Sequence, residues 1–254
     1  MSSEKQSFDS CFEVFLADTP EGKEINYNLR YRVYCEEMGF EDKDRFPDQM
    51  ESDDWDDHAV HFLLRHKGTG DWLGGVRLVA EKDSKLPFEE WSSTDRPITA
   101  QDRKVSVEMS RLCIVKEARR FASRRFAPYG LPEQEANGEG SNIRSFYDFK
   151  NQSRSIMWGL VHAAGLYSAQ QNFSHWYFIV APSLACFLNR GGLELEKIGA
   201  PCEHRGTRTP YQLSIENLLA NPMWLKDYKE GFRRYSELEE QKFSHRKVRA
   251  AGAR

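Results

Sequence analysis

The sequence has few of the features that mark secreted or membrane-spanning proteins. Its 254 residues include five scattered cysteines without a C-x-x-C pair, which we interpret as reduced thiols rather than as zinc ligands or a disulfide framework. No window approaches the roughly 20 apolar residues that span a bilayer, and the polar N-terminus carries no signal-peptide core. We therefore expect a cytoplasmic protein without a transmembrane segment. The sequence leaves peripheral membrane contact open.

A global excess of positive charge is also missing. The formal net charge is -3 although 30% of the residues are charged. This balance argues against a nucleic-acid-binding protein with a basic surface, so any polyanionic partner must meet a local patch. No internal repeat is visible. The hydrophobic content of 39% is sufficient for one large domain.

Hydrophobic spacing predicts an alternation of strands and helices. Pro20 and Gly22 come directly before the first helix, which Gly39 ends, and Pro182 opens a later helix that Gly191 closes. Strands are expected at 11–16, 60–64, 72–79, 105–115, 176–180, 193–198 and 209–215, and a long helix at about 148–170. This order predicts an α/β sandwich with a mixed central sheet.

Four short segments carry charged side chains, and the first two of them also carry aromatic ones. They are LRYRVYCEEMGF (29–40), SDDWDD (52–57), GGVRLV (74–79) and VEMSRLCI (107–114). In this order they resemble the acyl-homoserine lactone synthases, the autoinducer-synthase superfamily. The positions that match the family's motifs are Arg30, Tyr34, Phe40, Asp53, Trp55, Asp56, Arg77, Glu108, Ser110 and Arg111.

The resemblance covers residues 10–115 well and extends more weakly to 216. It implies an acetyltransferase-like (GNAT-type) α/β fold, a three-layer sandwich whose mixed central sheet is splayed. The sequence departs from the family at Tyr34, where Phe is expected, and at Phe40, where Trp is expected. Its extra length resembles a sister branch, the exosortase (PEP-CTERM) system-associated acyltransferases, whose members are thought to make N-acyl amino acids.

This resemblance also implies the domain organisation. We expect an acyltransferase domain over residues 1–220, with insertions near 81–103 and 116–145. A charged helical extension is expected over 221–254.

An acyl transfer to an amine requires a base, and Glu108 is the candidate. It lies on the polar face of the expected strand 105–115, whose alternation places Ser110 on the same face and Arg111 on the opposite one. Burial would raise its pKa toward the working pH. Alternatively, Glu108 is a buried ion-pair partner of Arg77 or Arg111. Ser110 would donate to the oxyanion, or it is only a small packed residue. Glu108, Ser110 and Arg111 form the predicted catalytic group.

The remaining motif residues are expected to bind the acceptor, a small amino-acid-like substrate. Arg30 either holds a substrate carboxylate through its guanidinium fork or ties down the acidic loop that contains Asp53 and Asp56. Arg77 could receive the same carboxylate. The aromatic residues wall the pocket, or they belong to the core; they are Tyr34, Phe40 and Trp55.

The donor is expected to be acyl carrier protein. After strand 105–115 the sequence contains no Q/R-x-x-G-x-G/A loop, with which typical acetyltransferases bind the coenzyme A pyrophosphate. A basic run follows instead, with Lys116, Arg119, Arg120, Arg124 and Arg125, which would attract an acidic carrier protein unless it is merely a solvated face. No cofactor and no metal are expected.

The sequence thus predicts an N-acyltransferase that moves a long-chain acyl group from acyl carrier protein to an amino acid. The first alternative is an acyl-homoserine lactone synthase, for which S-adenosylmethionine would be the acceptor. The second is a non-catalytic module that binds acyl chains or carrier protein.

Overall fold

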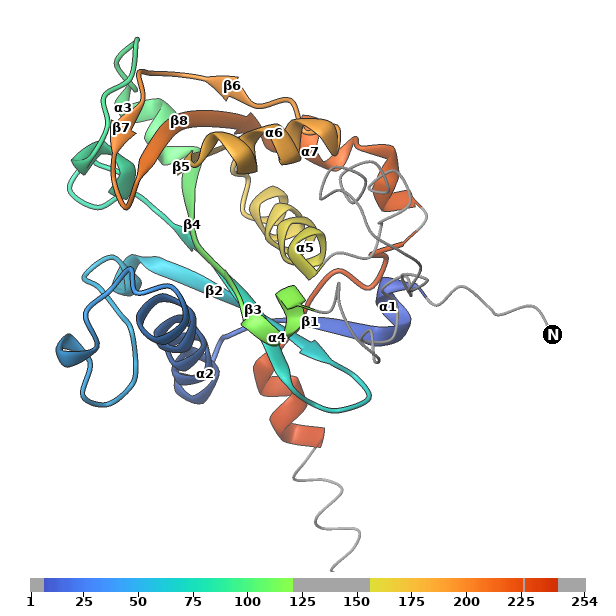
Figure 1. Cartoon of the computed structure of the whole chain (residues 1–254). Helices are drawn as coiled ribbons and strands as arrows, with labels where there is room; N and C mark the ends of the chain where they lie inside the picture. The colour runs from blue at the N-terminus through green and yellow to red at the C-terminus, as the bar shows by residue number, and fades with distance from the viewer. Residues whose placement is uncertain (1–6, 121–155, 226, 242–254) are drawn as a thin grey trace, which may run out of the picture.

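The computed structural model describes residues 7–120, 156–225 and 227–241, which form an open mixed sheet with helices on both faces (Figure 1). The sheet has the strand order β6-β8-β5-β4-β3-β2-β1-β9, and β7 pairs with β8. The strands are β1 (Phe12–Leu16), β2 (Ala59–His66), β3 (Trp72–Val79), β4 (Ser106–Ile114), β5 (His175–Val180), β6 (Glu196–Lys197), β7 (Cys202–Glu203), β8 (Thr207–Ser214) and β9 (Arg233–Arg234). The predicted α/β sandwich is confirmed.

Two longer helices cover the sheet. They are α2 (Pro20–Tyr31), which continues as the π-helical turn Arg32–Glu37, and α5 (Ile156–Gln170). Shorter helices are α1 (Phe8–Cys11), α3 (Ala100–Lys104), α4 (Lys116–Arg120), α6 (Pro182–Arg190) and α7 (Ile215–Leu219). In Figure 1, α2 and α5 lie on opposite sides of β2, β3 and β4. None of the described helices is long and apolar enough to span a membrane.

The start and end of α2 follow from its sequence. The Thr19 side chain accepts the N–H of Gly22, and Pro20 occupies the first turn, where no N–H donor is needed. Past the π-helical turn, Gly39 adopts φ +63°, the left-handed conformation that glycine tolerates best. The chain then leaves the helix toward the acidic segment 51–57.

The central sheet divides between β4 and β5. These parallel strands pair only where Ser106–Glu108 lie opposite His175–Tyr177. Beyond that point β4 continues to Ile114 beside β3, whereas β5 continues to Val180 beside β8. The expected splay is therefore present, and it begins at Glu108.

A bulge interrupts β4 within this splay. The β3–β4 register shifts between Gly75, which lies opposite Cys113, and Arg77, which lies opposite Ser110. Arg111 lies in the extra stretch and has φ +51°, an uncommon backbone conformation for a residue other than glycine. The predicted strict alternation, which separated Arg111 from Ser110, is wrong here, because both side chains reach the same cluster.

The C-terminal part belongs to the same core as the rest of the protein. Trp224 and Tyr228 are buried in the main hydrophobic cluster, and β9 pairs in parallel with β1. The Asp227 carboxylate accepts the N–H of Phe8 at 2.6 Å. Residues on both sides of the predicted boundary at residue 220 therefore pack into the same hydrophobic core. Residues 235–241 are helical, and the rest of the expected extension beyond 241 lies outside the described residues.

Two further expectations differ from the structure. The strand expected at 193–198 is reduced to Glu196–Lys197, and β7 was not expected. The connection 81–103 is more than a polar loop, because Leu86 and Phe88 are buried within it. Most of the predicted insertion 116–145 lies outside the described residues.

Candidate active site

The acidic segment is fixed to the sheet by buried arginines. Arg30, in α2, is fully buried, and its Nε donates to Glu51 at 2.5 Å. Its two terminal nitrogens donate to the Asp56 carboxylate at 2.7 and 3.0 Å, which is a bidentate arrangement. All three nitrogens of the guanidinium are thus used within the protein. In the structure Arg30 therefore ties down the acidic segment.

Arg77 and Arg111 complete the cluster from β3 and β4. Arg77 donates through Nη1 to Asp53 at 2.5 Å and to Asp56 at 2.8 Å, and through Nε to the Ser110 hydroxyl at 3.1 Å. Arg111 donates to Glu51 at 3.1 Å and to Asp53 at 2.8 Å. The three arginines therefore face three carboxylates, those of Glu51, Asp53 and Asp56.

The charges within this cluster compensate one another. Burial alone would raise the pKa of Asp56, but hydrogen bonds and charges from Arg30 and Arg77 hold it well below its usual value. The pKa of Asp53 is lowered in the same way, mainly by Arg77. The carboxylates of Asp53 and Asp56 therefore stay ionised, and the cluster links α2, β3 and β4 to the acidic segment.

Glu108 lies outside this network. It is only 4% exposed, and its Oε2 accepts the N–H of Phe88 at 2.6 Å. Among the described residues, no Lys or Arg nitrogen lies within 4.0 Å of its carboxylate. Burial raises its pKa to about 8, an effect that the Phe88 N–H and the charges of Arg77 and Arg111 only partly offset. The alternative of a direct ion pair is therefore not what the structure shows.

A small aromatic cluster encloses this carboxyl group. Tyr177 lies directly opposite Glu108 on β5, and its ring stacks on Phe88 with centroids 5.7 Å apart. Leu86 completes the cluster. The connection 81–103 thus excludes water from Glu108 and supplies its hydrogen-bond donor. The sequence carries no signal for this contact, whereas Glu51 belongs to the same acidic run as Asp53 and could have been included.

The predicted aromatic residues lie at different depths. The Tyr34 hydroxyl donates to the Leu112 carbonyl at 2.9 Å, and the Arg111 guanidinium lies 5.8 Å from its ring centroid. The Phe40 ring stacks at 6.4 Å from that of Tyr34 and is 37% exposed. Trp55 is half-buried, and its backbone N–H donates to Asp53 at 3.0 Å. Tyr34 therefore lies in the cluster and Phe40 lies at the surface beside it.

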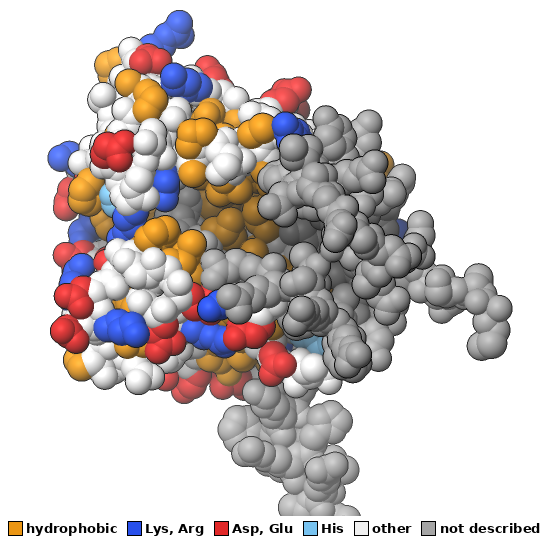
Figure 2. Space-filling model, viewed as in Figure 1, with side chains coloured by type: hydrophobic (Ala, Val, Ile, Leu, Met, Phe, Trp, Pro, Cys, Tyr) orange, Lys and Arg blue, Asp and Glu red, His pale blue; other side chains and the backbone are white. Residues whose placement is uncertain are grey.

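A hollow opens in the middle of the molecule. Figure 2 shows hydrophobic side chains on its floor and charged side chains along the lower edge. It lies in the region where Figure 1 shows β4 and β5 apart, below α6. A hydrophobic floor beside a splayed sheet suits an acyl chain.

For most of the predicted carrier-binding residues, the structure does not describe the side chain. Lys116 is exposed at the start of α4, and its backbone N–H donates to Glu37 at 3.1 Å. Arg119 and Arg120 belong to α4, but their side chains are not described. Arg124 and Arg125 lie outside the described residues. The basic run stays a prediction.

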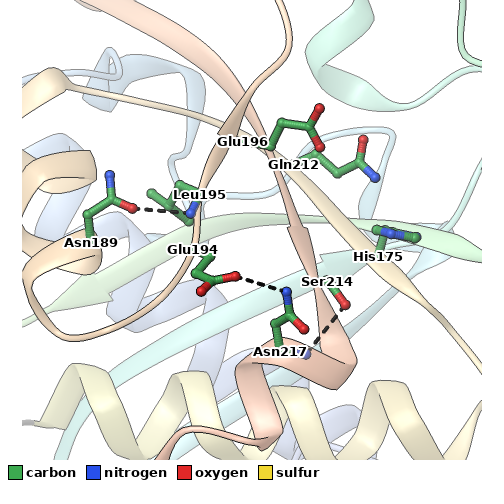
Figure 3. A pocket seen from close by; sticks show the side chains of 8 residues that line it. All are labelled: His175, Asn189, Glu194, Leu195, Glu196, Gln212, Ser214 and Asn217. Carbon is green, nitrogen blue, oxygen red and sulfur yellow. Dashed lines mark hydrogen bonds between the residues drawn. The ribbon is translucent and has the colours of Figure 1, made fainter.

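A separate cavity of about 310 Å³ lies at the far wing of the sheet, between β5, α6, β8 and α7 (Figure 3). Two hydrogen bonds join residues of its lining: Glu194 accepts from the Asn217 side chain at 3.2 Å, and the Asn189 side chain accepts the N–H of Leu195 at 3.1 Å. None of the predicted site residues lines it. Within the described residues, no group of His, Cys, Asp or Glu could hold a metal ion.

Comparison with known families supports this architecture. Residues 29–127 match a family model described as an acetyltransferase (GNAT) domain. The fold is that of the GNAT acetyltransferases. The prediction of an acyltransferase is confirmed at this level. The matched segment contains all the predicted acceptor-binding and catalytic residues, from Arg30 to Arg111.

Solved structures with the same fold include acyl-homoserine lactone synthases. BjaI, a CoA-dependent synthase solved with SAM and isopentyl-CoA, matches with a TM-score of 0.57 and 15% identity over 88% of this chain and 92% of its own. MesI, also a CoA-dependent synthase, matches with a TM-score of 0.51 and 16% identity over 83% and 92%. The predicted resemblance to autoinducer synthases is confirmed as a likeness of fold.

FeeM, an N-acyl amino acid synthase from uncultured soil microbes, matches with a TM-score of 0.49 and 11% identity over 85% of this chain and 97% of its own. This likeness is too distant to bear on the acceptor. The comparison with curated proteins gives no match. The resemblance to the exosortase-associated branch stays a prediction.

Proposed function

We propose that the protein transfers a long-chain fatty acyl group from an acyl carrier protein thioester to the α-amine of an amino acid. The observation that carries this proposal is Glu108, a buried carboxyl group at the point where β4 and β5 separate, with no ion pair to any residue that the structure describes. With a pKa of about 8, it is a base suited to neutral or slightly alkaline pH.

The reaction balances with this single base. The amine nitrogen attacks the thioester carbonyl carbon and forms the C–N bond, while Glu108 accepts a proton from the nitrogen, directly or through one water. The carbonyl oxygen becomes an oxyanion, for which backbone N–H groups of β4 beyond Glu108 are available, since β5 no longer pairs with them. The C–S bond then breaks, and the proton passes from Glu108 to the departing thiolate.

The choice of donor rests on the sequence. The missing pyrophosphate loop and the basic run from Lys116 favour acyl carrier protein over coenzyme A. Because BjaI and MesI are CoA-dependent, acyl-CoA is the donor to compare directly.

A second candidate function is acyl-homoserine lactone synthesis. It is favoured by the likeness of fold to BjaI, whose structure contains SAM. S-adenosylmethionine also presents an α-amine and a carboxylate, so the base at Glu108 would serve both acceptors. The half-buried Trp55 beside the acidic segment favours the smaller acceptor, because the sulfonium and adenosine require additional room.

The test uses the purified full chain with a long-chain acyl carrier protein or acyl-CoA, and with a mixture of amino acids or S-adenosylmethionine. Thiol release and mass spectrometry then identify donor and product. We expect N-acyl amino acid from the carrier-protein donor and no lactone. A lactone formed with consumption of S-adenosylmethionine would establish the second candidate. In cells that express the protein, full product formation with Glu108→Gln would instead favour a binding module without its own catalysis.

A further inference from the structure

The arginines of the candidate site already bind carboxylates of the protein, so their positive charges are not free to bind a carboxylate of the acceptor. An amino acid brings an α-carboxylate next to the attacking nitrogen, and this group requires a cationic partner in a partly buried site. Arg30 and Arg77 are almost fully buried and donate to the acidic segment. Arg111 donates to Glu51 and Asp53. The carboxylate therefore needs another cation.

The tip of the β7–β8 hairpin, residues 203–207, extends to this cluster from the other wing of the sheet. Arg205, at its turn, forms an ion pair with Glu41, whose carboxylate also lies 3.9 Å from Arg111. The His204 ring lies on Trp91, with centroids 4.4 Å apart. Figure 1 shows the hairpin pointing down toward the segment that follows α2. The ion pair of Arg205 with Glu41 and the ring contact of His204 with Trp91 thus hold the tip beside the cluster.

Arg208, in β8, is the arginine of this hairpin for which the described residues provide no carboxylate partner. It is half-buried, and its Nη1 donates to the Thr207 carbonyl at 3.1 Å. No carboxylate among the described residues lies within 4.0 Å of its guanidinium. Its charge is nevertheless felt nearby, since the pKa values of His204 and Arg205 are both lowered, first by burial and in part by Arg208. A half-buried cation without a counterion is ready to bind an anion.

We propose that Arg208, in β8 next to the hairpin tip, binds the α-carboxylate of the acceptor, with the ring of His204 in the tip as a second donor. This inference rests on the proposed function and adds the residue that makes the enzyme require an amino acid rather than a simple amine. The guanidinium fork would orient the acceptor so that its nitrogen points toward Glu108.

The phosphate of the donor's phosphopantetheine arm offers a related anionic chemistry. We assign the carboxylate because the hairpin tip contacts the acidic segment's cluster through Glu41 and Arg111, whereas the basic run expected to meet the carrier begins at Lys116, after β4. If Arg208 binds the acceptor carboxylate, its loss weakens the use of the amino acid. If it binds the donor phosphate, its loss weakens the use of the donor. One set of assays therefore distinguishes the two anions.

The experiment compares wild type, Arg208→Gln and a control variant, Arg190→Gln, which removes an exposed arginine at the end of α6. Each enzyme is assayed with the amino acid that wild type acylates fastest and with the decarboxylated amine of that amino acid. We expect Arg208→Gln to raise KM for the amino acid by about 10- to 100-fold, the usual effect of one charge-assisted hydrogen-bonded contact, with little change in kcat. KM for the amine and all values of the control should not change.

An equal rise in KM for both acceptors would overturn the assignment. A second set of assays uses an acyl-N-acetylcysteamine thioester as donor, which lacks phosphate. If the raised KM of Arg208→Gln disappears with this donor, Arg208 binds the phosphopantetheine phosphate, and the proposal is refuted. If wild type acylates no acceptor, the proposed function fails on its own. Calorimetric binding of the amino acid and its amine to wild type and Arg208→Gln then still tests the carboxylate site.

Discussion

The substitution Glu108→Gln tests the base with the smallest change in shape. Glutamine fills the same volume, and its amide oxygen can still accept the Phe88 N–H, which the carboxylate accepts at 2.6 Å. It cannot accept the proton of the amine. We expect kcat/KM to fall by about 10²- to 10⁴-fold, the usual contribution of a positioned general base.

The pH dependence gives a sharper criterion than the rate alone. Because burial raises the pKa of Glu108 to about 8, log(kcat/KM) of wild type should rise with unit slope below about pH 8 and level off above it. In Glu108→Gln this step should disappear. An ordinary glutamate would give a step near its usual value of 4.5.

The same shift predicts an effect on stability with a definite sign. A carboxyl group whose pKa rises from 4.5 to about 8 on folding stabilises the protein in its neutral form. This contribution is complete below pH 4.5 and is lost as the pH rises toward 8; by the cost of each pKa unit, it amounts to on the order of 5 kcal/mol. The Glu108→Gln variant has no carboxyl group to ionise at this position and does not lose this contribution. The difference in free energy of unfolding, variant minus wild type, should therefore increase between pH 5 and pH 9.

Both measurements use one set of proteins. Steady-state rates are followed by thiol release, and unfolding is followed in urea at each pH. The control is Glu196→Gln, which removes an exposed carboxylate on β6. A pH step near 8 that persists in Glu108→Gln, or an unchanged rate, would refute the assignment of the base.

Three further predictions concern the surroundings of this residue. Arg30→Met should lower the free energy of unfolding by about 3–5 kcal/mol, measured in urea, because Glu51 and Asp56 lose a buried partner; a loss below 1 kcal/mol would contradict the buried pairing. Burial lowers the pKa of His61 from 6.5 to about 3, so wild type should lose stability as the pH falls from 6.5 toward 3, and His61→Leu should show a smaller loss, measured by urea unfolding at pH 7 and 4. Phe88→Pro removes the N–H that lowers the pKa of Glu108, so the step in its pH–rate profile should move further above 8 than in Phe88→Ala, which keeps the N–H.

Much of the fold and the identity of the cluster could be predicted from the sequence. Local spacing located the strands around Arg77 and Glu108, since each has a clear hydrophobic pattern. It could not locate the bulge at Arg111, because an inserted residue changes the face of a side chain without changing composition. It also could not tell that Arg30 is fully paired, since pairing depends on three-dimensional distances to Glu51 and Asp56.

The acidic segment bears on the proposed role of Glu108 as a base. Arg77 lies on the strand next to Glu108, and a direct ion pair would lower the pKa of that carboxyl group and weaken it as a base. Instead, Asp53 and Asp56 bind the Arg77 guanidinium at 2.5 and 2.8 Å. They bind the Arg77 guanidinium in place of Glu108, whose carboxylate accepts the Phe88 N–H beside the cluster of Leu86, Phe88 and Tyr177. In the proposed reaction, the carboxylates of the acidic segment would therefore act indirectly, by competing for the arginine that would otherwise form an ion pair with the base.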